Sequence, residues 1–155
     1  MEAMIKLVNY LNKTNQTIST CESFTGGMFA NEITNISGAS NVYLGSFVSY
    51  QNSFKQSIVG VSERTIKKYG VVSEECAIEM AQNTLKLTKS DFSISFTGNA
   101  GPLAMENKEI GLAYICICSK SKYKVVEINE KNMNRIEFKE NGLTVALNLF
   151  LDFIK

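Results

Sequence analysis

The sequence predicts an α/β protein: a three-layer α/β/α sandwich around a mixed, mostly parallel sheet. Segments with helical periodicity alternate with strand-like segments through the first two thirds of the chain, and a pattern typical of a hairpin follows. The length of 155 residues, 45% of them hydrophobic, suits one compact core. We therefore expect a single domain that spans residues 1–155.

The first third of the chain alternates helix and strand signals. Residues 3–13 place apolar side chains at helical spacing, and TISTCES at residues 17–23 alternates β-branched with small polar residues, as strands do. A glycine-led turn and a second helical pattern follow at residues 25–35. The aromatic and β-branched stretch at residues 42–50 predicts another strand, in which Gly45 indicates either a bulge or a close approach of the backbone to another group.

The middle of the chain predicts three helices and a strand. Two short helical connectors are expected at residues 52–60 and 62–70, each ending at a glycine. A longer helix begins after Ser73, an N-cap residue followed by two acidic side chains that suit the positive end of a helix. Residues 91–96 alternate apolar with polar side chains, which predicts a third strand ending in a glycine-rich loop.

The last third predicts two strands and a helix. GLAYICICS at residues 111–119 has the composition of a buried strand, and KVVEINE at residues 124–130 predicts a shorter partner joined to it by a hairpin. Residues 134–155 form a long amphipathic helical pattern, in which Gly142 costs about 1 kcal/mol relative to alanine.

Charge and composition exclude several classes of protein. Sixteen basic against fifteen acidic residues give a net charge of +1, which predicts neither a nucleic-acid nor a membrane partner. No apolar run reaches the roughly 18–20 residues of a spanning helix, and the amino terminus lacks a signal-peptide core, so we expect a cytoplasmic protein. The four cysteines show no C-x-x-C spacing and there is no histidine, so we expect neither a bound metal nor a cofactor.

The absence of histidine also restricts covalent catalysis. It excludes Ser-His-Asp and Cys-His arrangements, so a nucleophile must be activated by Lys, Tyr, a carboxylate, a helix terminus or a metal. In the segment ESFTGG, Ser23 is either an exposed nucleophile or part of an anion-binding turn. Glu22 either orients a hydroxyl or binds a ribose, or it is an ordinary solvated acid. Alternatively, Gly26 and Gly27 only permit the turn and Thr25 caps the following helix.

Two further loops follow predicted strands and meet the first at the carboxyl edge of the sheet, where ligands bind in such folds. In one, a desolvated Lys55, or the Tyr50 phenol next to a lysine, can accept the proton of a serine, although each alone is also typical of an ordinary surface residue. Arg135 can clamp a phosphate or form a surface ion pair. The other loop either offers donors for a phosphate or an oxyanion at Thr97, Gly98, Asn99, Ala100 and Gly101, or serves only to turn the chain.

Five segments in register carry a family resemblance: STCESFTGG, GSFVSYQNSFKQSIVGV, YGVVSEE, SFTGNAGP and KEIGLAY. Together they resemble the CinA carboxyl-terminal domain family, whose characterised members are nicotinamide-mononucleotide deamidases. The resemblance covers most of the chain. It implies an α/β/α sandwich that hydrolyses the carboxamide of nicotinamide mononucleotide to nicotinic acid mononucleotide and ammonia, in pyridine-nucleotide salvage.

The resemblance also implies roles for individual residues. It places the family's motif serine on Ser23, its strand-end tyrosine on Tyr50 and its lysine on Lys55. Lys55, or Tyr50 under its influence, would deprotonate Ser23 for attack on the carboxamide. The Gly26–Gly27 turn or the GNAG loop would hold the oxyanion or the 5′-phosphate, and Arg135 matches a family arginine near the last helix.

Two segments depart from the family pattern. Phe24 stands where the family usually has cysteine. Asn99 replaces an isoleucine, and LAM at residues 103–105 replaces a glycine pair, which leaves fewer conformations with positive φ and less room beside a ligand. The alternative hypothesis is therefore a catalytically weak or inactive member that binds a nucleotide or a protein. The general frequency of symmetric assemblies suggests a homo-oligomer.

Overall fold

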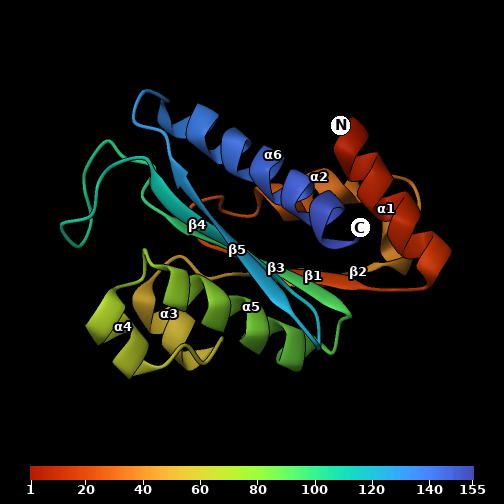
Figure 1. Ribbon diagram of the computed structural model, residues 1–155, viewed down its shortest axis with the longest axis horizontal. Helices are drawn as coiled ribbons and strands as arrows, with labels where there is room; N and C mark the ends of the chain where they lie inside the picture. The colour runs from red at the N-terminus through yellow and green to blue at the C-terminus, as the bar shows by residue number, and fades with distance from the viewer.

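A five-stranded mixed sheet forms the middle layer of the protein in the computed structural model, which describes residues 1–155 (Figure 1). The strands are β1 (Ile18–Glu22), β2 (Tyr43–Val48), β3 (Phe92–Gly98), β4 (Leu112–Cys118) and β5 (Tyr123–Asn129), in the order β2-β1-β3-β4-β5. β1 is parallel to both β2 and β3, whereas β4 is antiparallel to both β3 and β5. All strands except β4 therefore point the same way, and the predicted α/β sandwich with a mixed sheet is confirmed.

Helices cover both faces of this sheet (Figure 1). One face carries α1 (Glu2–Thr14), α2 (Met28–Thr34) and α6 (Arg135–Phe153), and a short 3₁₀ helix, η1 (Ala39–Asn41), precedes β2. The opposite face carries α3 (Asn52–Ser57), α4 (Glu63–Tyr69) and α5 (Glu74–Thr88). The predicted serine caps are present, because the side chains of Ser62 and Ser73 accept hydrogen bonds from the first turns of α4 and α5.

The central strand β3 is buried on both faces. Its apolar side chains Phe92, Ile94 and Phe96 belong to the main core beneath α1, α2 and α6. The polar side chains that alternate with them are buried as well. Their hydroxyl groups donate to backbone carbonyls of α5 and of the segment before it: Ser93 to Ala81, Ser95 to Ala77 and Thr97 to Val71. These hydrogen bonds make the burial tolerable.

Two local predictions concern the edges of the sheet. In the edge strand β2, the register steps from Ile18 opposite Tyr43 to Ser19 opposite Gly45, so one residue of β2 is extra. Gly45 has φ 144°, which confirms the bulge. At the other edge, β4 and β5 form the predicted hairpin, and the Ser119 N–H donates to the carbonyl of Lys122 at 2.9 Å.

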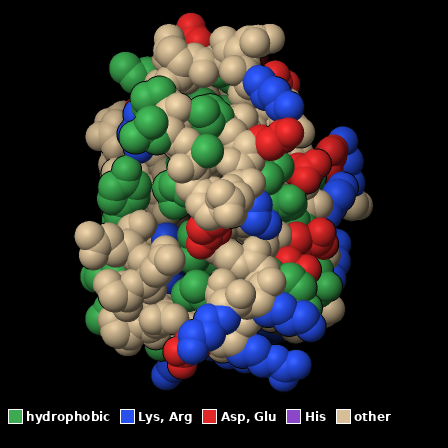
Figure 2. All heavy atoms as spheres, turned by 90° about the vertical axis from the view of Figure 1, so that its left-hand side faces the viewer, with side chains coloured by type: hydrophobic (Ala, Val, Ile, Leu, Met, Phe, Trp, Pro, Cys, Tyr) green, Lys and Arg blue, Asp and Glu red, His purple; other side chains and the backbone are tan.

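The parallel strands bring three loops to one edge of the sheet. The Ser23 N–H after β1 donates to the carbonyl of Phe96 in β3 at 3.0 Å, and the Ser49 N–H after β2 donates to that of Glu22 at 2.7 Å. Figure 2 shows the side of the molecule that lies on the left in Figure 1, where basic, acidic and hydrophobic side chains are interspersed. None of the helices is long and apolar enough to cross a membrane.

Candidate active site

A buried carboxylate holds the turn that follows β1. Glu22 is fully buried, and one of its oxygens accepts hydrogen bonds from the Thr25 hydroxyl at 2.8 Å and the Phe29 N–H at 3.0 Å. The other accepts from the Ala30 N–H at 3.1 Å and, more weakly, from the Ser46 hydroxyl at 3.4 Å. The carboxylate thus satisfies free N–H groups in the first turn of α2, where negative charge is favourable.

The glycines of the turn supply its shape. Gly26 and Gly27 have φ values of 62° and 96°, and Gly27 is the N-cap of α2 without any side-chain cap of its own. The sequence suggested substrate contacts for Glu22 and Thr25. In the structure the polar atoms of both side chains form hydrogen bonds within the protein, and neither residue lines the pocket described below.

Ser23 and Lys55 meet at the end of this turn. The Lys55 Nζ donates to the Ser23 Oγ at 3.1 Å and to the backbone carbonyl of Tyr50 at 3.2 Å. Lys55 comes from α3 and is 1% exposed, whereas Ser23 is 7% exposed. A lysine that is buried against a serine in this way fits the nucleophile and base pair predicted from the sequence.

The burial of Lys55 changes its proton affinity. No carboxylate lies within ion-pair distance of its ammonium group. Removal from water is the largest cause and lowers the pKa of Lys55, whereas electrostatic interactions with Cys76, Cys21 and Glu106 oppose it only in part. A lower pKa increases the neutral fraction near pH 7, and only the neutral amine can accept a proton from Ser23.

Tyr50 takes a different position from the one suggested by its spacing to Lys55. Its side chain is 62% exposed, and its hydroxyl accepts a hydrogen bond from the Arg135 guanidinium at 2.8 Å. Arg135 also donates to the carbonyl of Gly101 at 2.6 Å and thereby joins the second and third loops. Of the two bases that the sequence left open, the geometry favours Lys55, because the Tyr50 hydroxyl is engaged by Arg135.

A pocket of about 860 Å³ opens beside Ser23. Of the predicted site residues, it is lined by Ser23, Tyr50, Gly98, Asn99, Ala100, Gly101 and Arg135. Three further lining residues, Phe24, Leu103 and Met105, were noted in the sequence only as departures from the family pattern. The sequence analysis did not single out the others, which are Gln51, Asn52, Ser53 and Pro102; all adjoin the predicted loops, and that adjacency was the available signal. The lining contains one basic and no acidic side chain, which favours an anionic ligand.

Several predicted residues lie outside this lining. Lys55 lies behind Ser23, and Gly26 and Gly27 shape the turn. Thr97, for which a ligand contact was expected, is 1% exposed and its hydroxyl donates to the Val71 carbonyl. No three His, Cys, Asp or Glu side chains come together as a metal site would need.

Free backbone donors are available at the pocket. The N–H groups of Phe24 and Ala100 donate no hydrogen bond within the chain, although both residues line the pocket. Phe24 follows the candidate nucleophile directly, which is the usual place for an oxyanion donor after a serine on a tight turn. These two N–H groups are therefore available to donate hydrogen bonds to an oxygen that becomes negatively charged beside Ser23.

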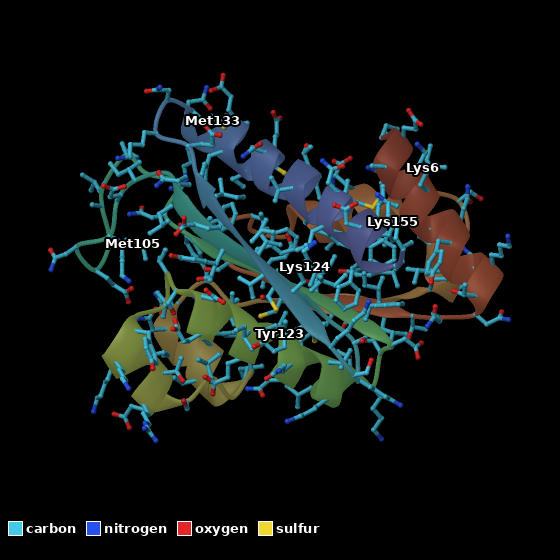
Figure 3. The ribbon with its side chains drawn as sticks, in the orientation of Figure 1. Lys6, Met105, Tyr123, Lys124, Met133 and Lys155 are labelled. Atoms are coloured by element: carbon cyan, nitrogen blue, oxygen red, sulfur yellow. The ribbon has the colours of Figure 1, made fainter.

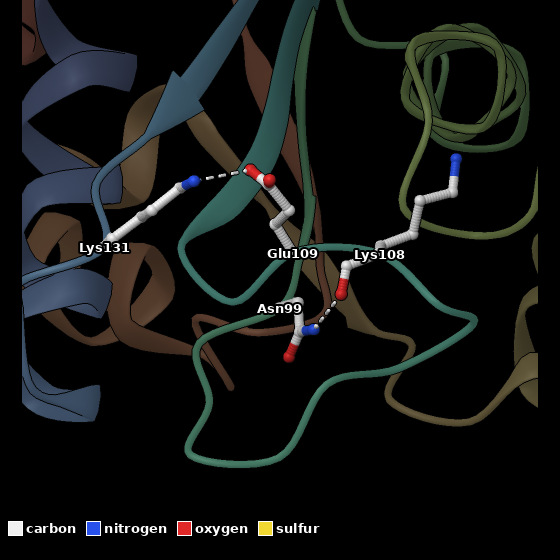
Figure 4. Close-up of polar contacts among 4 residues, drawn as sticks. All are labelled: Asn99, Lys108, Glu109 and Lys131. Atoms are coloured by element: carbon white, nitrogen blue, oxygen red, sulfur yellow. Dashed lines mark hydrogen bonds and ion pairs between the residues drawn. The ribbon is translucent and has the colours of Figure 1, made fainter.

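The loop between β3 and β4 is braced by Asn99. This side chain is 2% exposed, and with its amide nitrogen toward Leu103 it donates to that carbonyl at 3.0 Å while its oxygen accepts from the Met105 N–H at 2.9 Å. Figure 4 draws the opposite orientation, whose contact with the Lys108 carbonyl is 3.5 Å long and therefore weaker. On this loop the side chain of Leu103 is 81% exposed and that of Met105 is 46% exposed. Figure 3 shows Met105 on the part of the loop that projects from the molecule.

The side chain of Phe24 packs into the core. It is 4% exposed and contacts the rings of Phe96 and Phe138, at centroid distances of 6.5 and 5.3 Å. Its ring lies against Gly142 of α6, where a Cβ would be 2.8 Å from the Phe24 Cζ. The large side chain at position 24 is thus accommodated by a missing one on the facing helix.

These features define a class of site: a serine and a buried lysine at the carboxyl edge of an α/β/α sandwich, beside a pocket with a single positive charge. The family model described as the CinA C-terminal domain matches residues 2–154. The chain therefore belongs to the CinA carboxyl-terminal domain family.

Individual relatives agree with this assignment. The chain is 41% identical over 150 residues to a CinA-like protein of Pseudothermotoga lettingae, an alignment that covers 94% of this chain and 36% of the relative. It is 42% identical over 139 residues to a putative competence-damage inducible protein of Bacillus subtilis, covering 90% of this chain and 33% of the relative. The chain thus spans about a third of the length of these curated relatives.

Solved structures share the fold. The crystal structure of the competence/damage inducible protein CihA from Agrobacterium tumefaciens has a TM-score of 0.95 at 28% identity and covers 99% of this chain and 94% of its own. A competence or damage-inducible protein from Enterobacter asburiae has a TM-score of 0.96 at 22% identity, covering 99% of this chain and 97% of its own.

Proposed function

We propose that the protein is a serine amidohydrolase that converts nicotinamide mononucleotide to nicotinic acid mononucleotide and ammonia, with Ser23 as nucleophile and Lys55 as base. One observation carries the proposal: a lysine that is 1% exposed and has no carboxylate partner lies 3.1 Å from the hydroxyl of a serine at the edge of a pocket. A buried amine whose pKa is lowered by removal from water is characteristic of catalytic sites.

The first half of the reaction transfers the acyl group to the enzyme. Neutral Lys55 accepts the proton of the Ser23 hydroxyl while the Oγ attacks the carboxamide carbon. The N–H groups of Phe24 and Ala100 are the available donors for the carbonyl oxygen as it becomes negative. The Lys55 ammonium then returns a proton to the departing nitrogen, so ammonia leaves and an ester remains on Ser23.

The second half releases the acid. Lys55, neutral again, takes a proton from a water molecule, and the resulting hydroxide attacks the ester carbon. The C–O bond to Ser23 breaks, its oxygen regains the proton from Lys55, and the carboxylic acid leaves and ionises. One water is consumed for each ammonia released, and one lysine shuttles a proton in both halves.

The choice of substrate has two supports. The five motif segments resemble nicotinamide-mononucleotide deamidases, which gives the pyridine nucleotide as a small-molecule partner. The pocket independently favours an anion, because Arg135 is the one charged side chain in its lining. We place the 5′-phosphate at Arg135, whose guanidinium keeps N–H groups beyond the two that contact Tyr50 and Gly101.

The test is direct. Chelator-treated protein is incubated with nicotinamide mononucleotide, and ammonia and nicotinic acid mononucleotide are measured together. We expect equimolar products from the wild type and none from Ser23→Ala, which should remain folded by circular dichroism. A fully active Ser23→Ala variant would exclude the covalent scheme.

The rival function has one specific observation in its favour. The loop that departs from the family pattern turns the Asn99 amide inward and leaves Leu103 exposed at the pocket. If the folded protein binds the nucleotide in calorimetry but releases no ammonia, a nucleotide-binding member without turnover becomes the better description.

A further inference from the structure

The two loops that flank Ser23 give the pocket two unlike walls. β1 lies between β2 and β3 and is parallel to both, so the loop after β2 lies on one side of Ser23 and the loop after β3 on the other. The side chains with which the loop after β2 lines the pocket are Tyr50, Gln51, Asn52 and Ser53. From the loop after β3, the lining side chains other than Asn99 are apolar: Ala100, Pro102, Leu103 and Met105. A ligand that reaches Ser23 therefore has a largely polar wall on one side and a largely apolar wall on the other.

The apolar wall is held by contacts within the loop and by the last helix. Arg135 of α6 donates to the carbonyl of Gly101 at 2.6 Å. The amide of the buried Asn99 donates to the Leu103 carbonyl at 3.0 Å, and its oxygen accepts from the Met105 N–H at 2.9 Å. The backbone on both sides of the Leu103 side chain is therefore fixed by polar contacts.

The far end of the same loop is fastened to the junction of α4 and α5. The carboxylate oxygens of Glu106 accept from the Val71 N–H at 3.1 and 3.0 Å. This carboxylate occupies the space that a Cβ at Gly70 would fill, where φ is 80°. Lys108 adds a second connection by donating to the Tyr69 carbonyl at 3.2 Å. The wall is thus a loop with contacts along its length, and these contacts set the positions of the side chains that it presents to the pocket.

The side chain of Leu103 is held outside the core. It is the most exposed large apolar side chain of the protein, at 81%, and Met105 is 46% exposed. Neither residue belongs to the apolar clusters of the core. A leucine side chain gains stability from burial, but here the contacts of the loop keep it at the pocket. Leu103 therefore contributes little to the folding of the free protein, and its apolar surface is available to a ligand.

The proposed substrate carries an apolar surface at the matching place. Its carboxamide is bonded directly to a flat pyridine ring, so when Ser23 attacks the carboxamide carbon the ring lies in the pocket between the two walls. Aromatic faces and aliphatic side chains pack against each other because both leave water on contact. The wall that carries Leu103 and Met105 suits the face of this ring.

We propose that Leu103, with Met105 beside it, is a specificity-determining residue that packs on the face of the pyridine ring and thereby selects substrates whose amide is attached to a planar aromatic group. The proposal rests on the proposed function, which supplies the ring. It assigns a role to positions 103–105, at which the sequence departs from the family pattern and which the motif residues do not cover.

A matched pair of variants tests the contact. In a Ser23→Ala background, where the nucleotide is not consumed, Leu103→Asn keeps a side chain of similar size but makes it polar, whereas Leu103→Met keeps it apolar. Calorimetric titration with nicotinamide mononucleotide should give a Kd about tenfold higher than that of the parent for Leu103→Asn, and within about twofold of it for Leu103→Met. The control variant Leu87→Asn, at a position of α5 that is 55% exposed and outside the pocket, should bind as the parent does.

The melting temperature of each unliganded variant separates a ligand contact from a structural role. Because Leu103 lies outside the core, Leu103→Asn should melt at the temperature of its parent. A fall in the melting temperature of Leu103→Asn beyond that of Leu87→Asn would overturn the proposal. Equal Kd values for Leu103→Asn and Leu103→Met would also overturn it, as would a parent that does not bind the nucleotide.

Kinetics in the otherwise wild-type protein separate this proposal from the proposed function. Leu103→Asn should raise KM for nicotinamide mononucleotide about tenfold and leave kcat within about threefold, since Ser23 and Lys55 are unchanged. If the wild type binds the nucleotide and releases no ammonia, the proposed function fails, but the Kd values still decide on Leu103. If the wild type releases ammonia and Leu103→Asn has unchanged Kd and KM, the role of Leu103 is rejected and the proposed function stands.

Discussion

Two segments border the candidate site, and they are held in opposite ways. The turn after β1 is organised by Glu22, a fully buried carboxylate whose bonds reach residues of α2 and the neighbouring β2. The loop after β3 is organised by Glu106, an exposed carboxylate that reaches a segment 35 residues away. Both use an acid to satisfy backbone N–H groups, but only the first does so without solvent competition.

This difference predicts how amino-acid substitutions in the two segments should affect the protein. Ser23 is fixed by a buried network on which the local fold depends, so its position should be insensitive to the pocket loop. The loop carries the exposed Leu103 and Met105 and depends on a few contacts at its far end. We therefore expect changes near Ser23 and Lys55 to affect chemistry or folding, and changes in the loop to affect substrate binding.

The largest expected effect comes from Lys55→Met. Because the base is missing, kcat of this variant should be at least about 100-fold lower than that of the wild type. The control variant Lys86→Met, on the exposed side of α5, should have the kcat of the wild type. A kcat within fivefold of the wild type would show that Lys55 is not the base. Steady-state kinetics with nicotinamide mononucleotide decides between these outcomes.

The same variant should also change the pH dependence of stability. The pKa of Lys55 is lower in the folded protein than its ordinary value of 10.5, so the unfolded state binds more protons between these two values. The wild type should therefore gain stability as pH rises through that range, and Lys55→Met should lack this gain and be the more stable protein at neutral pH. Urea denaturation at several pH values measures both trends.

The next largest effect is expected from Glu22→Ala, which should reduce the stability of the folded protein. It leaves the Thr25 hydroxyl and the Phe29 and Ala30 N–H groups without their acceptor, so we expect a loss of about 2–4 kcal/mol in the free energy of unfolding. Glu106→Ala, whose acceptor role is exposed to water, should lose less than about 1 kcal/mol. Equal losses in the two variants would contradict the contrast between the segments.

Gly142→Ala should have a smaller effect that originates in packing. The new Cβ would lie 2.8 Å from the Phe24 ring, and overpacking of about 1–3 kcal/mol is offset in part by a gain of about 1 kcal/mol in helix propensity. The double variant with Phe24→Leu should recover the stability. If Gly142→Ala alone is as stable as the wild type, the contact is looser than the structure indicates.

Tyr50→Phe should have the smallest effect. Its hydroxyl accepts from Arg135 and does not reach Ser23, so kcat should stay within about threefold while KM rises slightly as Arg135 loses one partner. A drop in kcat as large as that of Lys55→Met would reinstate the phenol as part of the proton relay.

The sequence predicts the elements and the main site residues where the signals are local. Ser62, Ser73 and Gly45 each act on residues next to them, and their predicted caps and bulge are present. Parallel strands bring loops to one edge, so Ser23 and the Lys55 segment could be expected to meet.

The remaining roles depend on partners that are distant along the chain. Glu22 caps α2 by accepting hydrogen bonds from N–H groups seven and eight residues further along the chain. No rule of sequence spacing distinguishes a carboxylate with this role from one that contacts a ligand. Likewise, nothing local to Tyr50 indicates that its hydroxyl meets Arg135, 85 residues away. Asn99 was expected to offer a donor to a ligand. Composition could not show that its amide forms hydrogen bonds with the backbone of Leu103 and Met105 in its own loop.

The contact between Phe24 and Gly142 also constrains how these two positions can change. The Phe24 ring occupies the space that a Cβ at position 142 would fill, and the glycine alone costs about 1 kcal/mol in the helix. With the ring in place, a larger residue at position 142 alone is unfavourable, so a change at one position alters the cost of a change at the other. Across relatives, a small residue at the position of Phe24 should accompany alanine or serine at that of Gly142, and the two positions should change together.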